Sequence, residues 1–127
     1  MTPAAYLDAI KERLVTDPFV LRFHIRRERV SVQDGFIRAR LFLSDESMLE
    51  FAEYFQVTEA GDIEVVTYSY HWADAEGKLL RRWDNTPHYP GLDGFPHHVH
   101  VGESGKTLPS QPMTLFRVLD VLTGKQA

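Results

Sequence analysis

The feature that most constrains the fold of this chain is an alternation of apolar and basic side chains shortly after the N-terminal segment. The alternating side chains are Leu21, Arg22, Phe23, His24, Ile25 and Arg26. A second run with a period of two covers residues 36–43, after the turn-forming triplet Gln33-Asp34-Gly35. Because successive side chains of a strand point to opposite faces, each run predicts a strand with one buried face. Asp-Gly between two such runs is typical of a β-hairpin. The pattern therefore predicts an antiparallel sheet that is covered on one face.

The rest of the chain extends this sheet and adds a helix at each end. Apolar segments at 48–58, Ile63–Ala73 and 78–83 are separated by turn residues, and 97–101 is a short sixth candidate strand. Tyr6, Leu7, Ile10 and Leu14 have helical spacing between Pro3 and Asp17-Pro18. Thr114 is positioned as the N-cap of a final helix, and residues 102–112 read as a polar linker. We expect an α+β fold: an antiparallel meander of five to six strands with an N-terminal and a C-terminal helix packed on it.

Length and composition narrow the class of protein. A chain of 127 residues is expected to form one domain, residues 1–127. It has no cysteine, which excludes disulfides and thiolate metal sites. No apolar run is long enough to span a bilayer and no signal peptide is recognisable, so we expect a cytoplasmic protein without a membrane partner.

Arginines gather in the first two predicted strands, although the net charge is −4. If Arg22, Arg26, Arg38 and Arg40 share one face of the sheet, that face could bind a nucleic acid or a protein. A non-enzymatic binding module is therefore one of the candidate functions.

The chemistry is expected in a histidine-rich segment near the C-terminus. Four of the six histidines, His88, His97, His98 and His100, fall within thirteen residues. Residues 84–96 contain three prolines and two glycines and are expected to form an irregular loop of functional length. In a strand, His98 and His100 would point to the same face. Histidine titrates near neutral pH and is the commonest metal ligand, so two chemistries must be weighed.

The first chemistry is metal-free cleavage of RNA, which needs a general base, a general acid and cations for the phosphate. We expect His98 and His100 to be the acid/base pair and His97 and Asp84 to complete the catalytic site. Arg82 or Arg81 would bind the phosphate. The residues that complete the predicted substrate site are His88 at its rim, Asn85, and Tyr70 as a ring that stacks on a base.

The second chemistry is hydrolysis with a divalent metal such as zinc. His98 and His100 would be ligands, joined by His88 or Asp84, and His71 is a more distant candidate. The first chemistry needs no cofactor. A purely structural alternative remains, in which the histidines hydrogen-bond loop carbonyls and support the proline turns.

Three segments carry a family resemblance. Tyr68-Ser69-Tyr70-His71-Trp72, Arg82-Trp83-Asp84-Asn85-Thr86-Pro87-His88 and Phe95-Pro96-His97-His98-Val99-His100-Val101-Gly102 resemble the TumE-like family. Its members are short proteins described as the toxin half of toxin–antitoxin pairs. The resemblance implies a cognate antitoxin, of the helix-turn-helix DNA-binding type and encoded next door, and makes RNA the natural target. Tyr89 stands where relatives are expected to have a further histidine, so no ligand role is assigned to that position.

Overall fold

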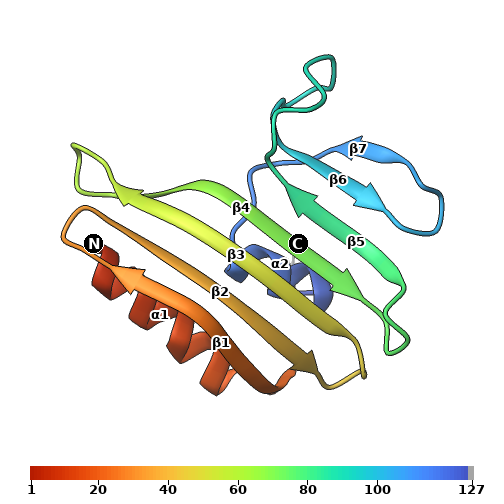
Figure 1. Cartoon of the computed structure of the whole chain (residues 1–127), viewed down its shortest axis with the longest axis horizontal. Coiled ribbons are helices and arrows are strands. Elements are labelled where there is room, and N and C mark those ends of the chain that lie inside the picture. Colours follow the sequence, from red (N-terminus) through yellow and green to blue (C-terminus); the bar gives the residue numbers. More distant parts are fainter. Residues whose placement is uncertain (126–127) are drawn as a thin grey trace.

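A computed structural model describes residues 1–125 and has the predicted α+β architecture. Its elements are α1 (Pro3–Thr16), β1 (Val20–Val30), β2 (Asp34–Leu43), β3 (Met48–Val57), β4 (Ile63–Ala73), β5 (Leu79–Asp84), β6 (His98–Val101), β7 (Thr107–Pro109) and α2 (Leu115–Leu122). The seven strands form one antiparallel sheet in chain order, β1 to β7 (Figure 1). The predicted meander is confirmed, and the strand that was not predicted, β7, lies in the expected linker.

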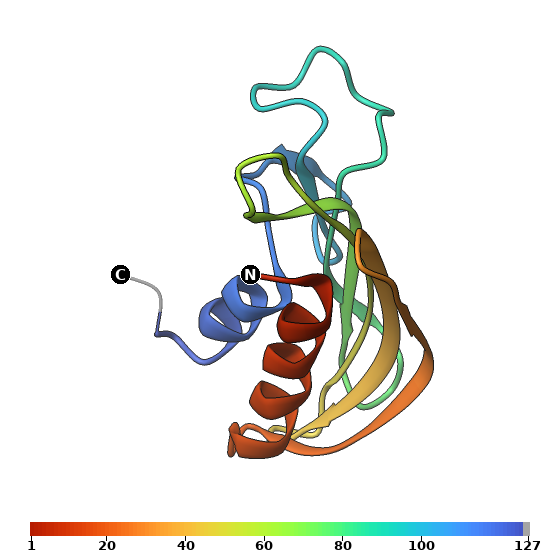
Figure 2. The ribbon, with the colours of Figure 1, turned by 90° about the vertical axis from the view of Figure 1, so that its left-hand side faces the viewer.

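Both helices cover the same face of the curved sheet (Figure 2). The Thr2 hydroxyl accepts a hydrogen bond from the Ala5 amide at the start of α1, and Thr114 does the same for Arg117 at the start of α2. The buried sides of the helices include Ile10, Leu14, Leu115 and Leu119. They share one apolar core with residues of the covered sheet face, including Ile37, Leu41, Leu49, Phe51, Phe55 and Tyr70. No helix within residues 1–125 is long and apolar enough to cross a membrane.

A buried carboxyl group connects the two layers. Glu53 on β3 accepts hydrogen bonds from the Tyr6 hydroxyl of α1 at 2.8 Å and the Tyr70 hydroxyl of β4 at 2.7 Å. Glu53 also accepts a hydrogen bond from the Leu115 amide at 2.7 Å. This amide is at the start of α2, where it has no acceptor within the helix. Burial raises the pKa of Glu53, and these three donors oppose that rise. The carboxyl group thereby fixes both helices to the centre of the sheet.

The alternation predicted for β1 fails at its first apolar residue. Leu21 is 68 % exposed, whereas the preceding Val20 is buried. A β-bulge between Val20 and Arg22 inserts one residue and shifts the phase of the strand. From Arg22 the expected pattern resumes, with Phe23 and Ile25 packed against the core.

Candidate active site

The strand order places two pairs of candidate residues side by side on the uncovered face. In the β5–β6 pairing, Asp84 lies opposite His98 and Arg82 lies opposite His100. Because the side chains of one strand alternate between faces, all four belong to the face that the helices leave free. They lie at the base of the loop between β5 and β6, which projects beyond the sheet (Figure 2).

Asp84 is the centre of this group. Its Oδ1 lies 2.8 Å from His98 Nε2, and its Oδ2 lies 3.6 Å from His100 Nε2. Arg82 Nε donates to Oδ2 at 3.1 Å and the Thr86 amide donates to Oδ1 at 3.1 Å. Burial raises the pKa of Asp84, but the Thr86 amide, Arg82 and His98 outweigh it and hold the pKa below its ordinary value. Asp84 is therefore an ionised carboxylate at neutral pH.

Each of the two histidines uses its other ring nitrogen on an outer partner. His98 Nδ1 lies 2.8 Å from the Pro96 carbonyl oxygen, and His100 Nδ1 lies 3.2 Å from the Thr107 hydroxyl. A carbonyl oxygen can only accept, so Nδ1 of His98 carries a proton. These bonds orient both Nε2 atoms toward Asp84. Although His98 Nε2 is buried and only 2.8 Å from Asp84, the two atoms are not aligned for a hydrogen bond.

The two imidazoles differ in their access to solvent. His98 is 2 % exposed, whereas the His100 side chain is 29 % exposed. Burial lowers the pKa of His100 despite the opposing effect of Asp84, so His100 is a neutral imidazole at neutral pH. A ligand on the uncovered face can therefore reach His100 directly, and it can influence His98 only through other groups.

Tyr89 is a neighbour of the site that sequence reasoning did not include. Its ring centroid lies 5.0 Å from that of His98 and 6.0 Å from that of His100, in edge-to-face geometry. Its position directly after His88, in a loop expected to be functional, was the available signal.

Two of the predicted residues in this segment lie apart from Asp84. The His97 Nδ1 atom is 2.6 Å from the Tyr68 hydroxyl and the two rings are stacked, on the face opposite to His98. Burial lowers the pKa of His97, and the neighbouring His98 adds to this effect. His88 is exposed in the loop, and its ring lies edge-to-face with that of Tyr89 at a centroid distance of 6.3 Å.

Three further predicted residues have other surroundings. Asn85 donates to the Val66 carbonyl at 2.8 Å and accepts from the Tyr68 amide at 3.0 Å, so its side chain holds the β4 backbone. Tyr70 is 0 % exposed and its hydroxyl is bonded to Glu53 in the core. Arg81 lies opposite Val101 and Trp72, in the row of the helix-covered face.

Among residues 1–125, the group that could hold a metal ion is Asp84, His98 and His100. One carboxylate oxygen and two imidazole nitrogens of these residues lie within 4.8 Å of one another. Of the other proposed ligands, His71 on β4 is separated from His100 by Arg82 of β5. The arrangement offers either an acid/base pair around a carboxylate or a three-ligand metal site.

A family model described as Toxin TumE matches residues 10–124. The chain belongs to the TumE toxin family. The match covers the second half of α1, the whole sheet and α2, and it confirms the predicted family. Membership of the TumE family makes the chain the toxin of a toxin–antitoxin system, with a cognate antitoxin as partner. No curated protein and no solved structure matches the chain significantly.

Proposed function

We propose that this toxin cleaves RNA at a site formed by Asp84, His98, His100 and Arg82. The observation that carries the proposal is the Asp84 carboxylate with an imidazole nitrogen on each oxygen and a guanidinium beside them. Histidine suits proton transfer near neutral pH, and arginine suits the charge of a phosphodiester. A toxin that acts by breaking RNA needs both groups at one accessible position.

The reaction that fits these groups is attack of a ribose 2′-hydroxyl oxygen on the adjacent phosphorus. His100 Nε2, neutral and accessible, takes the hydroxyl proton as the P–O bond forms. The bond from phosphorus to the 5′ oxygen breaks, leaving a 2′,3′-cyclic phosphate. The 5′ oxygen takes a proton from solvent or from the imidazolium. Arg82, whose side chain is 42 % exposed, stabilises the phosphorane charge.

His98 acts as a positioning residue in this reaction, since it is too buried to touch the substrate. Its Nδ1–H bond to Pro96 fixes the ring beside Asp84, while the Thr86 amide and Arg82 hold the carboxylate itself. The carboxylate then stabilises His100 when that residue takes up its proton.

The test is cleavage of end-labelled single-stranded RNA by the purified full chain. We expect His100→Ala and Asp84→Asn to lower the cleavage rate at least about a hundredfold. Thermal melts establish whether these variants are folded. Arg82→Gln should lower the rate strongly, while Arg81→Gln, on the other face of the same strand, is the matched control. A DNA strand of the same sequence should not be cut, since it has no 2′-hydroxyl. Equal cleavage by folded His100→Ala would refute the proposal.

A metal-dependent hydrolase with the same residues is the second candidate. The short but misaligned contact between His98 Nε2 and Asp84 Oδ1 favours it, because a cation bound beside this pair would take a lone pair from each. Both histidines also have the outer Nδ1 partner that is typical of metal ligands. A zinc ion held by three protein ligands would keep a fourth position for water.

Chelation separates the two candidates. Cleavage of RNA that survives EDTA, and is not increased by added zinc, supports the metal-free reaction. Loss of cleavage in EDTA with recovery on addition of zinc supports the metal centre. Calorimetric titration with zinc should then give one site per chain that His98→Ala abolishes.

A further inference from the structure

The uncovered face of the sheet has an excess of positive charge. Strand register assigns six arginines to it: Arg22, Arg27, Arg29, Arg38, Arg40 and Arg82. Arg26, at a second bulge of β1, joins them through its ion pair with Glu50 of the same face. The carboxylates on the same face are Asp34, Glu50, Glu64 and Asp84. The face therefore has three more positive than negative charges, although the whole chain has a net charge of −4. Segregation of this kind suits a polyanionic ligand.

Aromatic rings are interleaved with these arginines. The Arg22 guanidinium lies 4.1 Å from the centroid of Phe42, and that of Arg27 lies 6.0 Å from the centroid of Phe36. The Arg29 guanidinium lies 5.9 Å from the centroid of the Tyr54 ring. Rings and guanidinium planes on an exposed sheet are the groups on which unpaired bases stack.

Two adjoining hollows connect this surface to the candidate active site. They share Ala52 and Ser69, whose small side chains form the floor of both. The first hollow is mostly apolar and includes Phe36, Tyr54 and Pro87. The second is polar and includes Arg38, His71 and Arg82. Ser69 lies directly opposite Asp84 in the β4–β5 pairing, so both hollows end beside the proposed catalytic carboxylate.

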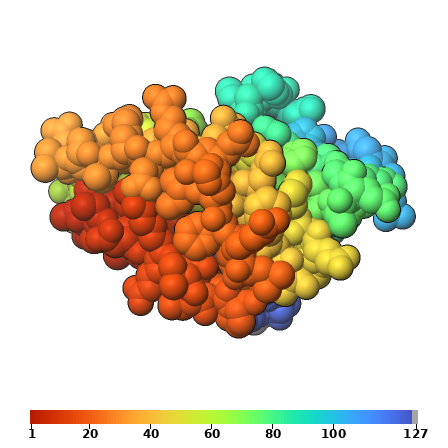
Figure 3. Space-filling model, turned by 60° about the horizontal axis from the view of Figure 1, so that its bottom comes forward, coloured from red at the N-terminus to blue at the C-terminus, as the bar shows by residue number. Residues whose placement is uncertain are grey.

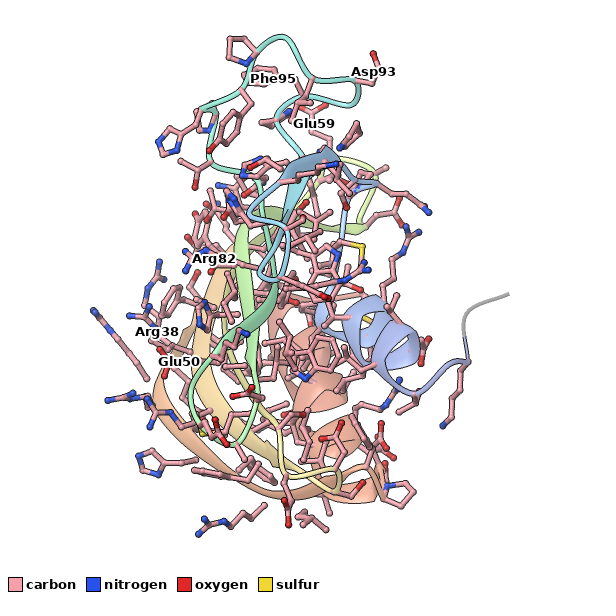
Figure 4. The ribbon with its side chains drawn as sticks, turned by 90° about the vertical axis from the view of Figure 1, so that its right-hand side faces the viewer. Arg38, Glu50, Glu59, Arg82, Asp93 and Phe95 are labelled. Carbon is pink, nitrogen blue, oxygen red and sulfur yellow. The ribbon has the colours of Figure 1, made fainter. Side chains whose placement is uncertain are left out.

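The views of the molecule agree with this arrangement. Arg38, Glu50 and Arg82 project from the side of the sheet that faces away from α2 (Figure 4). In the space-filling view, the orange residues of β1 are followed across the surface by yellow and then by the green β4–β5 region (Figure 3). The loop between β5 and β6 projects above them (Figure 3).

We propose that this face, from β1 to β5, binds single-stranded RNA and leads it to Asp84 and His100. The inference rests on the proposed ribonuclease function and adds the form of the substrate and its path. One row of strand partners, Arg27, Arg38, Ala52, Ser69 and Asp84, crosses the sheet toward the site. Its four strand spacings cover about 19 Å, at about 4.8 Å each.

The chemistry of the face favours a single strand over a duplex. Phosphates meet Arg27 and Arg38, which are exposed, while bases stack against Phe36 and Tyr54 in the apolar hollow. A duplex keeps its bases paired and stacked inside, so it could use only the arginines.

The experiment measures RNA binding separately from cleavage. The full chain with His100→Ala is titrated into fluorescein-labelled oligouridine of about twelve nucleotides, and anisotropy is recorded at several salt concentrations. Introducing Arg27→Gln and Arg38→Gln together should reduce the slope of log Kd against log salt by about 1.4, at about 0.7 for each lost phosphate contact. Phe36→Leu keeps an apolar side chain but removes the ring, and should raise Kd about 5- to 150-fold. The matched control is Arg81→Gln, from which we expect no change, and thermal melts show that each variant is folded.

Each outcome supports or overturns the binding surface. Unchanged binding in the Arg27→Gln, Arg38→Gln variant overturns it, as does competition by duplex RNA that equals competition by the single strand. If the predicted binding pattern is found but the wild-type chain cuts no RNA, the proposed catalysis is wrong and the surface stands. If RNA is cut with a KM that the paired arginine variant leaves unchanged, the surface is wrong and the catalysis stands.

Discussion

Replacing Glu53 tests whether one buried carboxyl group fixes both helices to the sheet. Glu53→Leu fills a similar volume but leaves three donors without their acceptor: the hydroxyls of Tyr6 and Tyr70 and the amide of Leu115. An unsatisfied buried donor costs about 1–3 kcal/mol. Tyr6 is only 8 % exposed but lines a surface hollow from which water can reach it, and Tyr70 keeps a longer bond to the Met113 carbonyl. The Leu115 amide loses its acceptor without such a replacement. Removing the carboxyl group also removes the free-energy cost of burying it, which offsets part of the loss.

These terms give a loss of about 3 kcal/mol for Glu53→Leu. At about 2.1 cal/mol/K per residue of unfolding entropy, this corresponds to a fall in Tm of about 11 °C. Glu53→Gln is the matched control, because its carbonyl can accept from Tyr70 and Leu115 while its amide donates to the Tyr6 hydroxyl. It should cost less than about 1 kcal/mol at neutral pH.

The stability of the wild type and that of Glu53→Gln should also depend differently on pH. Burial raises the pKa of Glu53 above its unfolded value, so the stability from this group is fully present below the ordinary pKa of about 4.3. That stability is lost as pH rises through the higher pKa of the folded state. Glu53→Gln has no titratable group at this position. Its free energy of unfolding should therefore rise relative to that of the wild type as pH increases from about 4.5 to 8. Denaturant unfolding at several pH values measures both effects. Equal losses for the Leu and Gln variants, at every pH, would refute the reasoning.

Three further predictions address the site and its supports. Gly102→Ala should destabilise the fold by about 3 kcal/mol or more, because its Cβ would lie 1.8 Å from the Leu79 carbonyl oxygen. Gly91→Ala, where a Cβ meets nothing within 4 Å, should be neutral in the same denaturant assay. Because burial lowers the pKa of His100, RNA cleavage should persist below the ordinary histidine pKa of about 6.5, and an acidic limb centred above that value would contradict the role of neutral His100. Asn85→Ala should cost about 1–3 kcal/mol by freeing the Tyr68 amide, and unchanged stability in the denaturant assay would contradict the role of Asn85 in holding the β4 backbone.

Local patterns in the sequence were sufficient for the order of elements and for the two faces of most strands. The period of two placed His98 and His100 on one face, and the same rule separates Arg81 from Arg82. It failed at Leu21, where a bulge changes the phase, and at β7, whose three residues are too few for a pattern. The aromatic row of Tyr68, Tyr70 and Trp72 favoured a core position over base stacking, yet Tyr70 was also included in the predicted substrate site; the structure places it in the core.

The sequence by itself determined that this is a half-covered antiparallel sheet with a histidine-bearing loop, because alternation and turn residues are local properties. Only the tertiary structure decided that Asp84 lies opposite His98, that Arg82 lies opposite His100, and that the arginines of β1 and β2 share their face. Strand order and register set these pairings, and they depend on burying one apolar face against two helices. The free energy of burying that face comes from contacts throughout the core, so it cannot be deduced from any short segment of the sequence.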